Sequence, residues 1–166
     1  MTDTADARTR PPAARVAASK AAQEALLASS DPALAANKRL VYDMYREIVQ
    51  GGHADRVEAY FTAEYIQHNP NISSGRDAFV AFLTGSRPAR PVEELVQLPI
   101  VNILAEGDYV IVLSQRPQTD AQGEPYVTSW FDFYRIEDGL IAEHWDPALK
   151  SADMLKFDPH IYRAKR

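Results

Sequence analysis

The chain contains no cysteine, which excludes disulfide bonds, thiolate nucleophiles and cysteine-ligated metal sites. Basic residues are also few: 18 Lys and Arg stand against 23 Asp and Glu, and the formal net charge is −5 at pH 7. Because nucleic acids are bound through clustered Lys and Arg, no nucleic-acid partner is expected. No apolar run approaches the ~20 residues of a membrane-spanning helix, so no membrane association is expected either.

Residues 1–30 carry several arginines but lack the apolar stretch of a secretory signal. Gln23 and Glu24 interrupt the alanine-rich segment 21–28, so the sequence predicts a cytoplasmic protein. A phosphate-binding glycine loop, a nucleophile elbow and a zinc-protease motif are all absent. We expect residues 1–30 to form a mobile or loosely packed extension, residues 31–150 a single domain, and residues 151–166 a C-terminal tail.

Helices are predicted in the first half of this domain and strands in the second half. Asp31-Pro32 is typical of a helix start, and Gly51-Gly52 of a helix end. Apolar spacing indicates helices over 31–50, 54–61 and 75–83, with a short strand over 64–68. Alternating and turn-bounded segments indicate strands over 95–104, 109–115, 126–136 and 140–145. This order predicts an α+β fold, in which about three helices cover one face of a curved antiparallel sheet and enclose one pocket.

Strand alternation assigns the polar side chains to faces. His144 and Asp146 share one face, opposite Glu143 and Trp145. Trp130, Asp132 and Tyr134 likewise share a face, opposite Phe131 and Phe133, while Tyr45 lies on the apolar face of the first helix. His68 and Asn69 are expected at the pocket rim. Each residue also has a structural interpretation: Asp132 as a partner of Arg135, His144 as a buried structural histidine, Asp146 as a strand terminator, Tyr45 as a core tyrosine, and His68-Asn69-Pro70 as a turn.

Four histidines raise the question of a metal site. His144 and Asp146 have a spacing that allows shared ligation, but His53 and His160 lie in segments that look exposed. A complete site would need His68 and a further group, so we predict no bound metal and no cofactor.

The motifs of residues 34–150 resemble the SnoaL-like polyketide cyclases. These proteins belong to the nuclear-transport-factor-like superfamily, which also holds ketosteroid isomerases and limonene epoxide hydrolases. The most specific segments are Tyr65-Ile66-Gln67-His68-Asn69-Pro70 followed by Gly75-Arg76, and Phe131-Asp132-Phe133-Tyr134-Arg135 followed by Asp138-Gly139 and Glu143-His144-Trp145-Asp146.

The resemblance implies roles for single residues. The oxyanion-donating tyrosine and protonated aspartic acid of the isomerases correspond to Tyr45 and Asp132, but their base corresponds to Asn69, which cannot accept a proton. The acid/base aspartate of the cyclases corresponds to Asp146, whereas Asp132 stands where they have an assisting histidine. The epoxide hydrolases use an Asp-Arg-Asp set. Asp146 corresponds to one of its aspartates and Arg116 corresponds loosely to its arginine, but no second aspartate is evident in that strand.

We therefore expect acid/base chemistry (enolisation, aldol-type cyclisation or isomerisation) on a small apolar carbonyl compound. Asp146 would be the base, Tyr45 or protonated Asp132 the donor, and His144 or His68 the proton relay. The residues expected to contact the substrate are Asn69, Tyr65, Trp130 and Arg116. The alternatives are a non-catalytic ligand-binding or dimerisation module of the same fold, and an epoxide hydrolase-like water addition.

The sheet face opposite the pocket carries Phe131, Phe133 and Trp145, which is too apolar to remain in water. The resemblance implies that this face forms a homodimer. A monomer would require the N-terminal extension to cover it.

Overall fold

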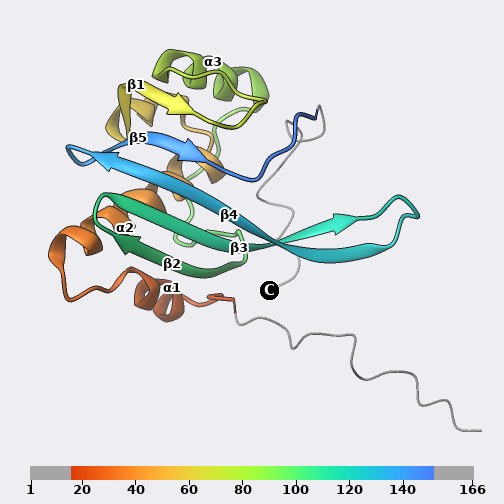
Figure 1. Ribbon diagram of the computed structural model, residues 1–166, viewed down its shortest axis with the longest axis horizontal. Helices are drawn as coiled ribbons and strands as arrows, with labels where there is room; N and C mark the ends of the chain where they lie inside the picture. Colours follow the sequence, from red (N-terminus) through yellow and green to blue (C-terminus); the bar gives the residue numbers. More distant parts are fainter. Residues whose placement is uncertain (1–15, 152–166) are drawn as a thin grey trace, which may run out of the picture.

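The computed structural model describes residues 16–151 (Figure 1). Its helices are α1 Lys20–Leu27, α2 Pro32–Met44, the π-helical segment η1 Tyr45–Gln50, the 3₁₀ helix η2 Ala54–Ala59, and α3 Arg76–Ser86. Its strands are β1 Phe61–Gln67, β2 Ile100–Glu106, β3 Tyr109–Thr119, β4 Pro125–Glu137 and β5 Leu140–Trp145. The α+β class is confirmed. In this described range no helix is both long enough and apolar enough to cross a membrane.

The five strands form one mixed sheet in the order β1-β5-β4-β3-β2. Strands β2 to β5 are antiparallel neighbours, as predicted, and β3 and β4 extend past the others as a long hairpin (Figure 1). The sheet differs from the predicted antiparallel one in that β1 runs parallel to β5, with Gln67 opposite His144. No tight turn links β1 to β5, so hairpin geometry does not set the direction of β1. This pairing places the end of β1 beside the polar end of β5.

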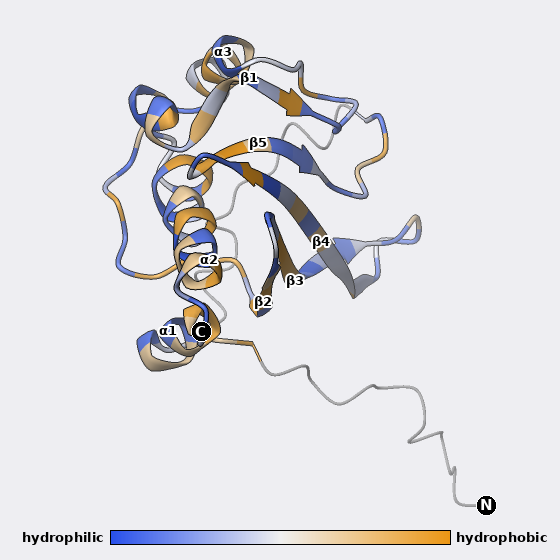
Figure 2. Ribbon diagram, turned by 60° about the vertical axis from the view of Figure 1, so that its left-hand side comes forward, coloured by the Kyte–Doolittle hydropathy of each residue, from blue (hydrophilic) through white to orange (hydrophobic). Residues whose placement is uncertain are grey.

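The long helical stretch α2–η1 lies across the sheet and begins as the sequence predicts. The Asp31 carboxylate accepts the backbone N–H groups of Ala33 and Leu34, and Pro32 occupies the first turn. Val41 of α2 and Ile48 of η1 are fully buried and point into the core. At Tyr45 the α-helix changes to π-helical turns, a feature that is frequent at functional sites. Figure 2 shows α2 on one side of the sheet.

Residues 16–30 differ from the expectation of a loosely packed extension. Ser19 caps α1, and the backbone N–H of Ala17 donates to the Ile100 carbonyl at the edge strand β2. The fully buried Gln23 amide donates to the carbonyls of Ala17 and Val96 and accepts the Val96 N–H. The buried Gln23 thus ties α1 to the domain, together with Leu27 in the core and the Arg39–Glu24 ion pair.

The second strand also begins later than predicted, at Ile100 rather than residue 95. Pro99 has no N–H to donate to a ladder, and the preceding backbone bonds to side chains instead. The Gln97 N–H donates to Gln50 Oε1, and the Gln50 amide nitrogen donates to the Leu95 carbonyl. This segment therefore closes the end of the η1 helix and does not extend the sheet.

Candidate functional site

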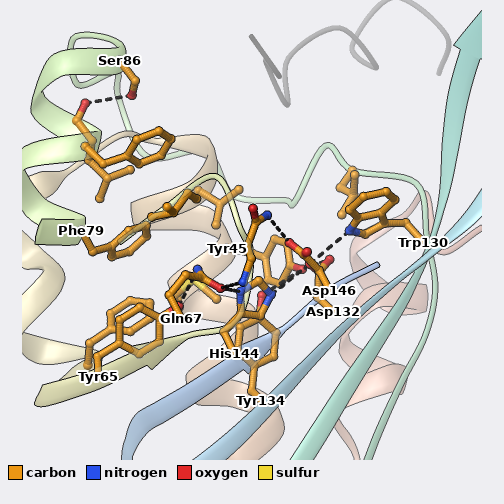
Figure 3. Close-up of a pocket in the computed structure, with 18 of the residues that line it drawn as sticks. Tyr45, Tyr65, Gln67, Phe79, Ser86, Trp130, Asp132, Tyr134, His144 and Asp146 are labelled. Carbon is orange, nitrogen blue, oxygen red and sulfur yellow. Dashed lines mark hydrogen bonds and ion pairs between the residues drawn. The ribbon is translucent and has the colours of Figure 1, made fainter. Parts of the chain in front are cut away.

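A cavity of ≈ 170 Å³ lies between the sheet and the helices. Its volume is close to that of engineered apolar cavities of about 150 Å³ that bind benzene, so it suits a ring-sized ligand. The apolar lining comes from Met44, Val49, Phe61, Ile72, Phe79, Phe82, Leu83 and Leu98. The polar lining comes from Gln67, Asn69, Ser86, Arg87, Ser114, Arg116, Asp132, His144 and Asp146. Figure 3 shows the aromatic side chains of Tyr65 and Phe79 at one end and the two aspartates at the other.

Asp132, on β4, is the centre of the hydrogen-bond network. Its Oδ2 accepts the Tyr45 hydroxyl at 2.6 Å, and its Oδ1 accepts the Trp130 indole N–H at 3.2 Å. Nε2 of His144 lies 3.1 Å from Oδ1. Strand alternation predicted that Trp130, Asp132 and His144 face the pocket, and all three line the cavity. Because the Tyr45 hydroxyl already donates its hydrogen bond to Asp132, it is not a free donor to a substrate oxygen.

His144 is oriented by Gln67. Oε1 of Gln67 accepts the backbone N–H of Asn69 at 3.0 Å, which fixes which end of the amide carries the oxygen. Nδ1 of His144 lies 3.0 Å from the same oxygen and must therefore donate to it. With Nδ1 protonated, the contact between Nε2 and Asp132 fits either a neutral imidazole beside a carboxylic acid or an imidazolium beside a carboxylate. The two forms differ by the position of one proton, which is the property of a proton relay.

Asp146 lies just beyond β5 and faces the same cavity. Its Oδ2 accepts the Asn69 amide N–H at 2.8 Å, and its Oδ1 accepts the Ala148 backbone N–H at 3.0 Å. The Asn69 oxygen in turn accepts the backbone N–H of Asn71 at 2.9 Å, which fixes the orientation of the Asn69 amide. Both donors to Asp146 are neutral groups, so these contacts orient the carboxylate without neutralising its charge. Asn69 is thus a positioning residue for Asp146.

The two tyrosines beside Asp132 remain protonated donors at neutral pH. Burial raises the pKa of Tyr45 well above its usual value, and the charge of Asp132 adds to the effect. Burial and Asp132 raise the pKa of Tyr134 in the same way, and its hydroxyl donates to Tyr45 at 3.2 Å. The Tyr65 hydroxyl accepts the Gln67 amide N–H at 2.9 Å, and Tyr65 lines the cavity. Burial, followed by the charge of Asp146, also raises the pKa of Tyr65.

Arg116 and Trp130 form one wall of the cavity. The Arg116 guanidinium carbon lies 3.8 Å from the centre of the Trp130 ring, within the range of a cation–π contact. Arg116 is largely buried and lines the cavity. Its position brings a positive charge into the same space as two carboxylates.

His68 lies away from the cavity, although it was predicted as a candidate proton relay. Its ring stacks on Trp145 with centroids 4.5 Å apart, and its Nε2 lies 3.0 Å from Oε2 of Glu143. Glu143 also accepts the Arg135 guanidinium, and these two partners lower the pKa of Glu143. The alternation along β1 gives the reason: Tyr65, Gln67 and Asn69 face inward, so His68 faces outward.

Gln67 was missed by the sequence reasoning, although the same alternation could have found it. An inward-facing residue between Tyr65 and Asn69 is expected to contact the pocket, but a glutamine carries no chemical signature of its own. Ser114, a fully buried cavity-lining residue on β3, was also missed. Ser114 directly follows the apolar residues 109–113, and only the structure shows that it lines the cavity.

Among residues 16–151, one trio offers metal-ligand types: Asp132, His144 and Asp146, whose ligand atoms all lie within 4.8 Å of one another. One imidazole and two carboxylates would suit Zn²⁺. In the structure, however, the facing atoms of Asp132 and His144 already serve each other as hydrogen-bonding partners. The same spacing therefore also suits the transfer of a proton.

Comparisons with known proteins agree with a small α+β domain of this fold. A family model described as the SnoaL-like domain matches residues 41–144, and the chain belongs to this family. No curated protein was found to match the chain.

Two solved structures support the fold. One is a proposed polyketide cyclase from Acidithiobacillus ferrooxidans, with 17% identity and a TM-score of 0.50 over 72% of this chain and 89% of that one. The other is a proposed SnoaL-like polyketide cyclase from Jannaschia sp. CCS1, with 16% identity and a TM-score of 0.50 over 72% of this chain and 91% of that one.

Proposed function

We propose that the protein catalyses acid/base chemistry on a small, mainly apolar carbonyl compound, beginning with removal of a proton α to the carbonyl. The observation that carries the proposal is the meeting of Asp132, His144 and Asp146 at the polar end of an otherwise apolar cavity. Enolisation requires groups that exchange protons beside a mainly apolar binding cavity. Membership of the SnoaL-like family and the named polyketide cyclases of this fold agree with such chemistry.

Asp146 is the proposed base. Its carboxylate is oriented by Asn69 and Ala148 but is not neutralised by them, so it can accept a proton. In the reaction the α C–H bond breaks, the proton passes to an Asp146 oxygen, and the electron pair moves through the new C=C bond to the carbonyl oxygen. Protonation at a new carbon, or attack on a second carbonyl, then gives isomerisation or aldol-type cyclisation.

The pair Asp132–His144 is the proposed reservoir for the second proton. Gln67 holds the imidazole so that Nε2 faces Asp132, and Tyr45 and Trp130 hold the carboxylate. A carboxylate fixed by several donors keeps its place while the proton between it and His144 moves. The network therefore orients the pair, and Tyr45 acts on the reaction through Asp132.

The test is proton exchange with ring-sized ketones such as acetophenone and cyclohexanone. In D₂O the wild-type protein should catalyse deuterium incorporation at the α-carbon, followed by NMR of the ketone. Asp146→Asn should lower the rate about 10²- to 10⁴-fold, the usual contribution of a general base. Asp138→Asn is a matched control, because it removes an exposed carboxylate at a turn whose positive φ an asparagine also adopts.

The exchange experiment also separates the enzyme from the alternative of a non-catalytic binding module. A module would bind these ketones with similar affinity in the wild type and in Asp146→Asn, and would exchange no proton in either. Undiminished exchange in Asp146→Asn would show that another group is the base.

One observation favours epoxide opening as a second candidate. Asp132 and Asp146 come close together, and Arg116 lines the same cavity, so two carboxylates and a guanidinium are present after all. Incubation with styrene oxide in H₂¹⁸O distinguishes this candidate, since water addition would place one ¹⁸O in the diol product at a rate that depends on Asp146.

A further inference from the structure

Ser114 is a fully buried residue of β3 that lines the cavity, and its hydroxyl has no hydrogen-bond partner within residues 16–151. Buried hydroxyl groups are nearly always paired, and an unpaired one costs free energy. A hydroxyl on the wall of a ligand-sized cavity is paired when its side chain rotates to meet a ligand oxygen. The unmatched group therefore points to a ligand atom and not to a defect of the core.

The neighbouring donors on this wall are already engaged. The Tyr45 hydroxyl and the Trp130 indole N–H both donate to Asp132. The Asn69 amide N–H donates to Asp146, and Nδ1 of His144 faces Gln67. A ligand oxygen placed at any of these groups would have to break a bond that holds a carboxylate or the imidazole. Ser114 can donate without such a loss.

The sheet register brings Ser114 next to the acid/base trio. Ser114 pairs with Trp130 across β3 and β4, and Val112 pairs with Asp132, so Ser114 and Asp132 are diagonal neighbours on the inner face. Diagonal neighbours lie about 7–8 Å apart, a distance that one carbonyl group with its α-carbon can bridge. Arg116 is the next inward residue on the same strand, with its guanidinium over Trp130.

Charge determines the orientation of the ligand. An oxygen that becomes negative on enolisation is repelled by the carboxylates of Asp132 and Asp146. On the β3 side the wall offers a neutral donor and a guanidinium instead. The α-carbon then lies toward Asp146 and the carbonyl oxygen toward β3.

We propose that Ser114 donates the hydrogen bond that anchors the ligand's carbonyl oxygen, with Arg116 supplying positive charge beside it. This inference rests on the proposed function for the identity of the ligand, and it names the group that contacts the oxygen. It assigns to Ser114 the contact that Tyr45 cannot make while it is bonded to Asp132.

The test compares acetophenone with α-methylstyrene, which has the same shape but carries a methylene group in place of the oxygen. Equilibrium affinities are measured by NMR titration of the labelled protein, so no turnover is needed. In the wild type acetophenone should bind more tightly, and Ser114→Ala should reduce this preference about 3- to 10-fold, as expected for one hydrogen bond. Affinity for α-methylstyrene should be unchanged, and the melting temperature should stay the same or rise because an unpaired buried hydroxyl is removed.

Ser86→Ala is the matched control. Ser86 also lines the cavity, but its hydroxyl donates to the Leu83 carbonyl at 2.9 Å, as Figure 3 shows. The control should keep the wild-type preference for acetophenone. An equal preference in the wild type and Ser114→Ala, or no preference in the wild type, would overturn the assignment. Because the readout is binding, its failure is distinguishable from loss of exchange in Asp146→Asn, which tests the proposed base.

Discussion

Nδ1 of His144 lies 3.0 Å from Oε1 of Gln67, an oxygen that also accepts the backbone N–H of Asn69. This contact joins two strands that are far apart in sequence but parallel and adjacent in the sheet, since Gln67 of β1 is opposite His144 of β5. Because the Asn69 N–H fixes which end of the Gln67 amide carries the oxygen, the backbone just after β1 determines that Nδ1 of His144 is protonated. The tautomer is thus a consequence of sheet topology.

The first prediction is that Nδ1 of His144 carries a proton in the resting protein. Long-range ¹H–¹⁵N spectra of the histidine rings should show a protonated Nδ1 for His144. His53 is an internal reference for a protonated Nε2, because its Nε2 lies 2.7 Å from the Arg90 carbonyl and must be the donor. Gln67→Met keeps the side-chain size but removes the acceptor, and should lower ketone exchange about 10-fold through misorientation of the imidazole. An unprotonated Nδ1 of His144 in the wild type would contradict the hydrogen bond from Nδ1 to Gln67.

The faces of β4 and β5 could be predicted from sequence because a strand has a period of two. That period placed Asp132, His144 and Asp146 together once the strands were located. The alternation was not applied to His68, which was expected at the pocket rim after the strand; β1 ends at Gln67, and Tyr65, Gln67 and Asn69 face inward. The histidine was chosen for its chemistry and not for its position in this alternation.

The N-terminal helix shows a different limit of sequence reasoning. The segment was predicted to be loosely packed, yet one of the residues that hold α1 in place is Gln23, which is 1% exposed. A glutamine is buried this deeply only when the backbone of a distant segment meets its amide, here at Val96. No local pattern carries that information. Ser114 escaped notice for the same reason, because the cavity beside it is formed by distant elements.

The second prediction concerns stability at high pH. Burial raises the pKa of Tyr45, Tyr65 and Tyr134 in the folded protein, whereas an unfolded chain releases tyrosine protons near pH 10. Above about pH 10 the folded state therefore binds more protons than the unfolded state, and stability must fall as pH rises. Each such tyrosine contributes up to about 1.4 kcal/mol per pH unit, and the stabilisation is fully present below pH 10.

Urea unfolding of Tyr134→Phe between pH 9 and pH 11 checks this prediction. Removal of one buried phenol should reduce the decline of the unfolding free energy by about 1.4 kcal/mol per pH unit at the top of this range. Tyr134 is suited to the test because its hydroxyl donates only to Tyr45 among the contacts described above, and Tyr45 keeps its bond to Asp132. Parallel curves for the wild type and Tyr134→Phe would show that Tyr134 ionises as readily in the folded state as in the unfolded chain.

The third prediction is a homodimer formed through the outer face of the sheet, opposite the cavity. Three large apolar side chains there are exposed: Leu104 at 55%, Tyr109 at 41% and Phe131 at 45%. Tyr109 stacks on Phe133, which packs against Trp145, so the apolar surface continues across β2 to β5. A continuous patch of this kind on a sheet face favours burial against a self-complementary copy.

Phe131→Glu should place a charge in this patch and shift the protein to monomer at micromolar concentration, measured by sedimentation velocity. Leu149→Glu is the matched control, since Leu149 is 80% exposed but lies beyond the end of β5, and this variant should remain dimeric. Phe131 faces away from the cavity, so ketone affinity in Phe131→Glu should stay within about twofold of the wild type. A wild-type protein that sediments as a monomer would contradict the dimer, whereas loss of ketone binding together with dimerisation would mean that the partner subunit helps to shape the cavity.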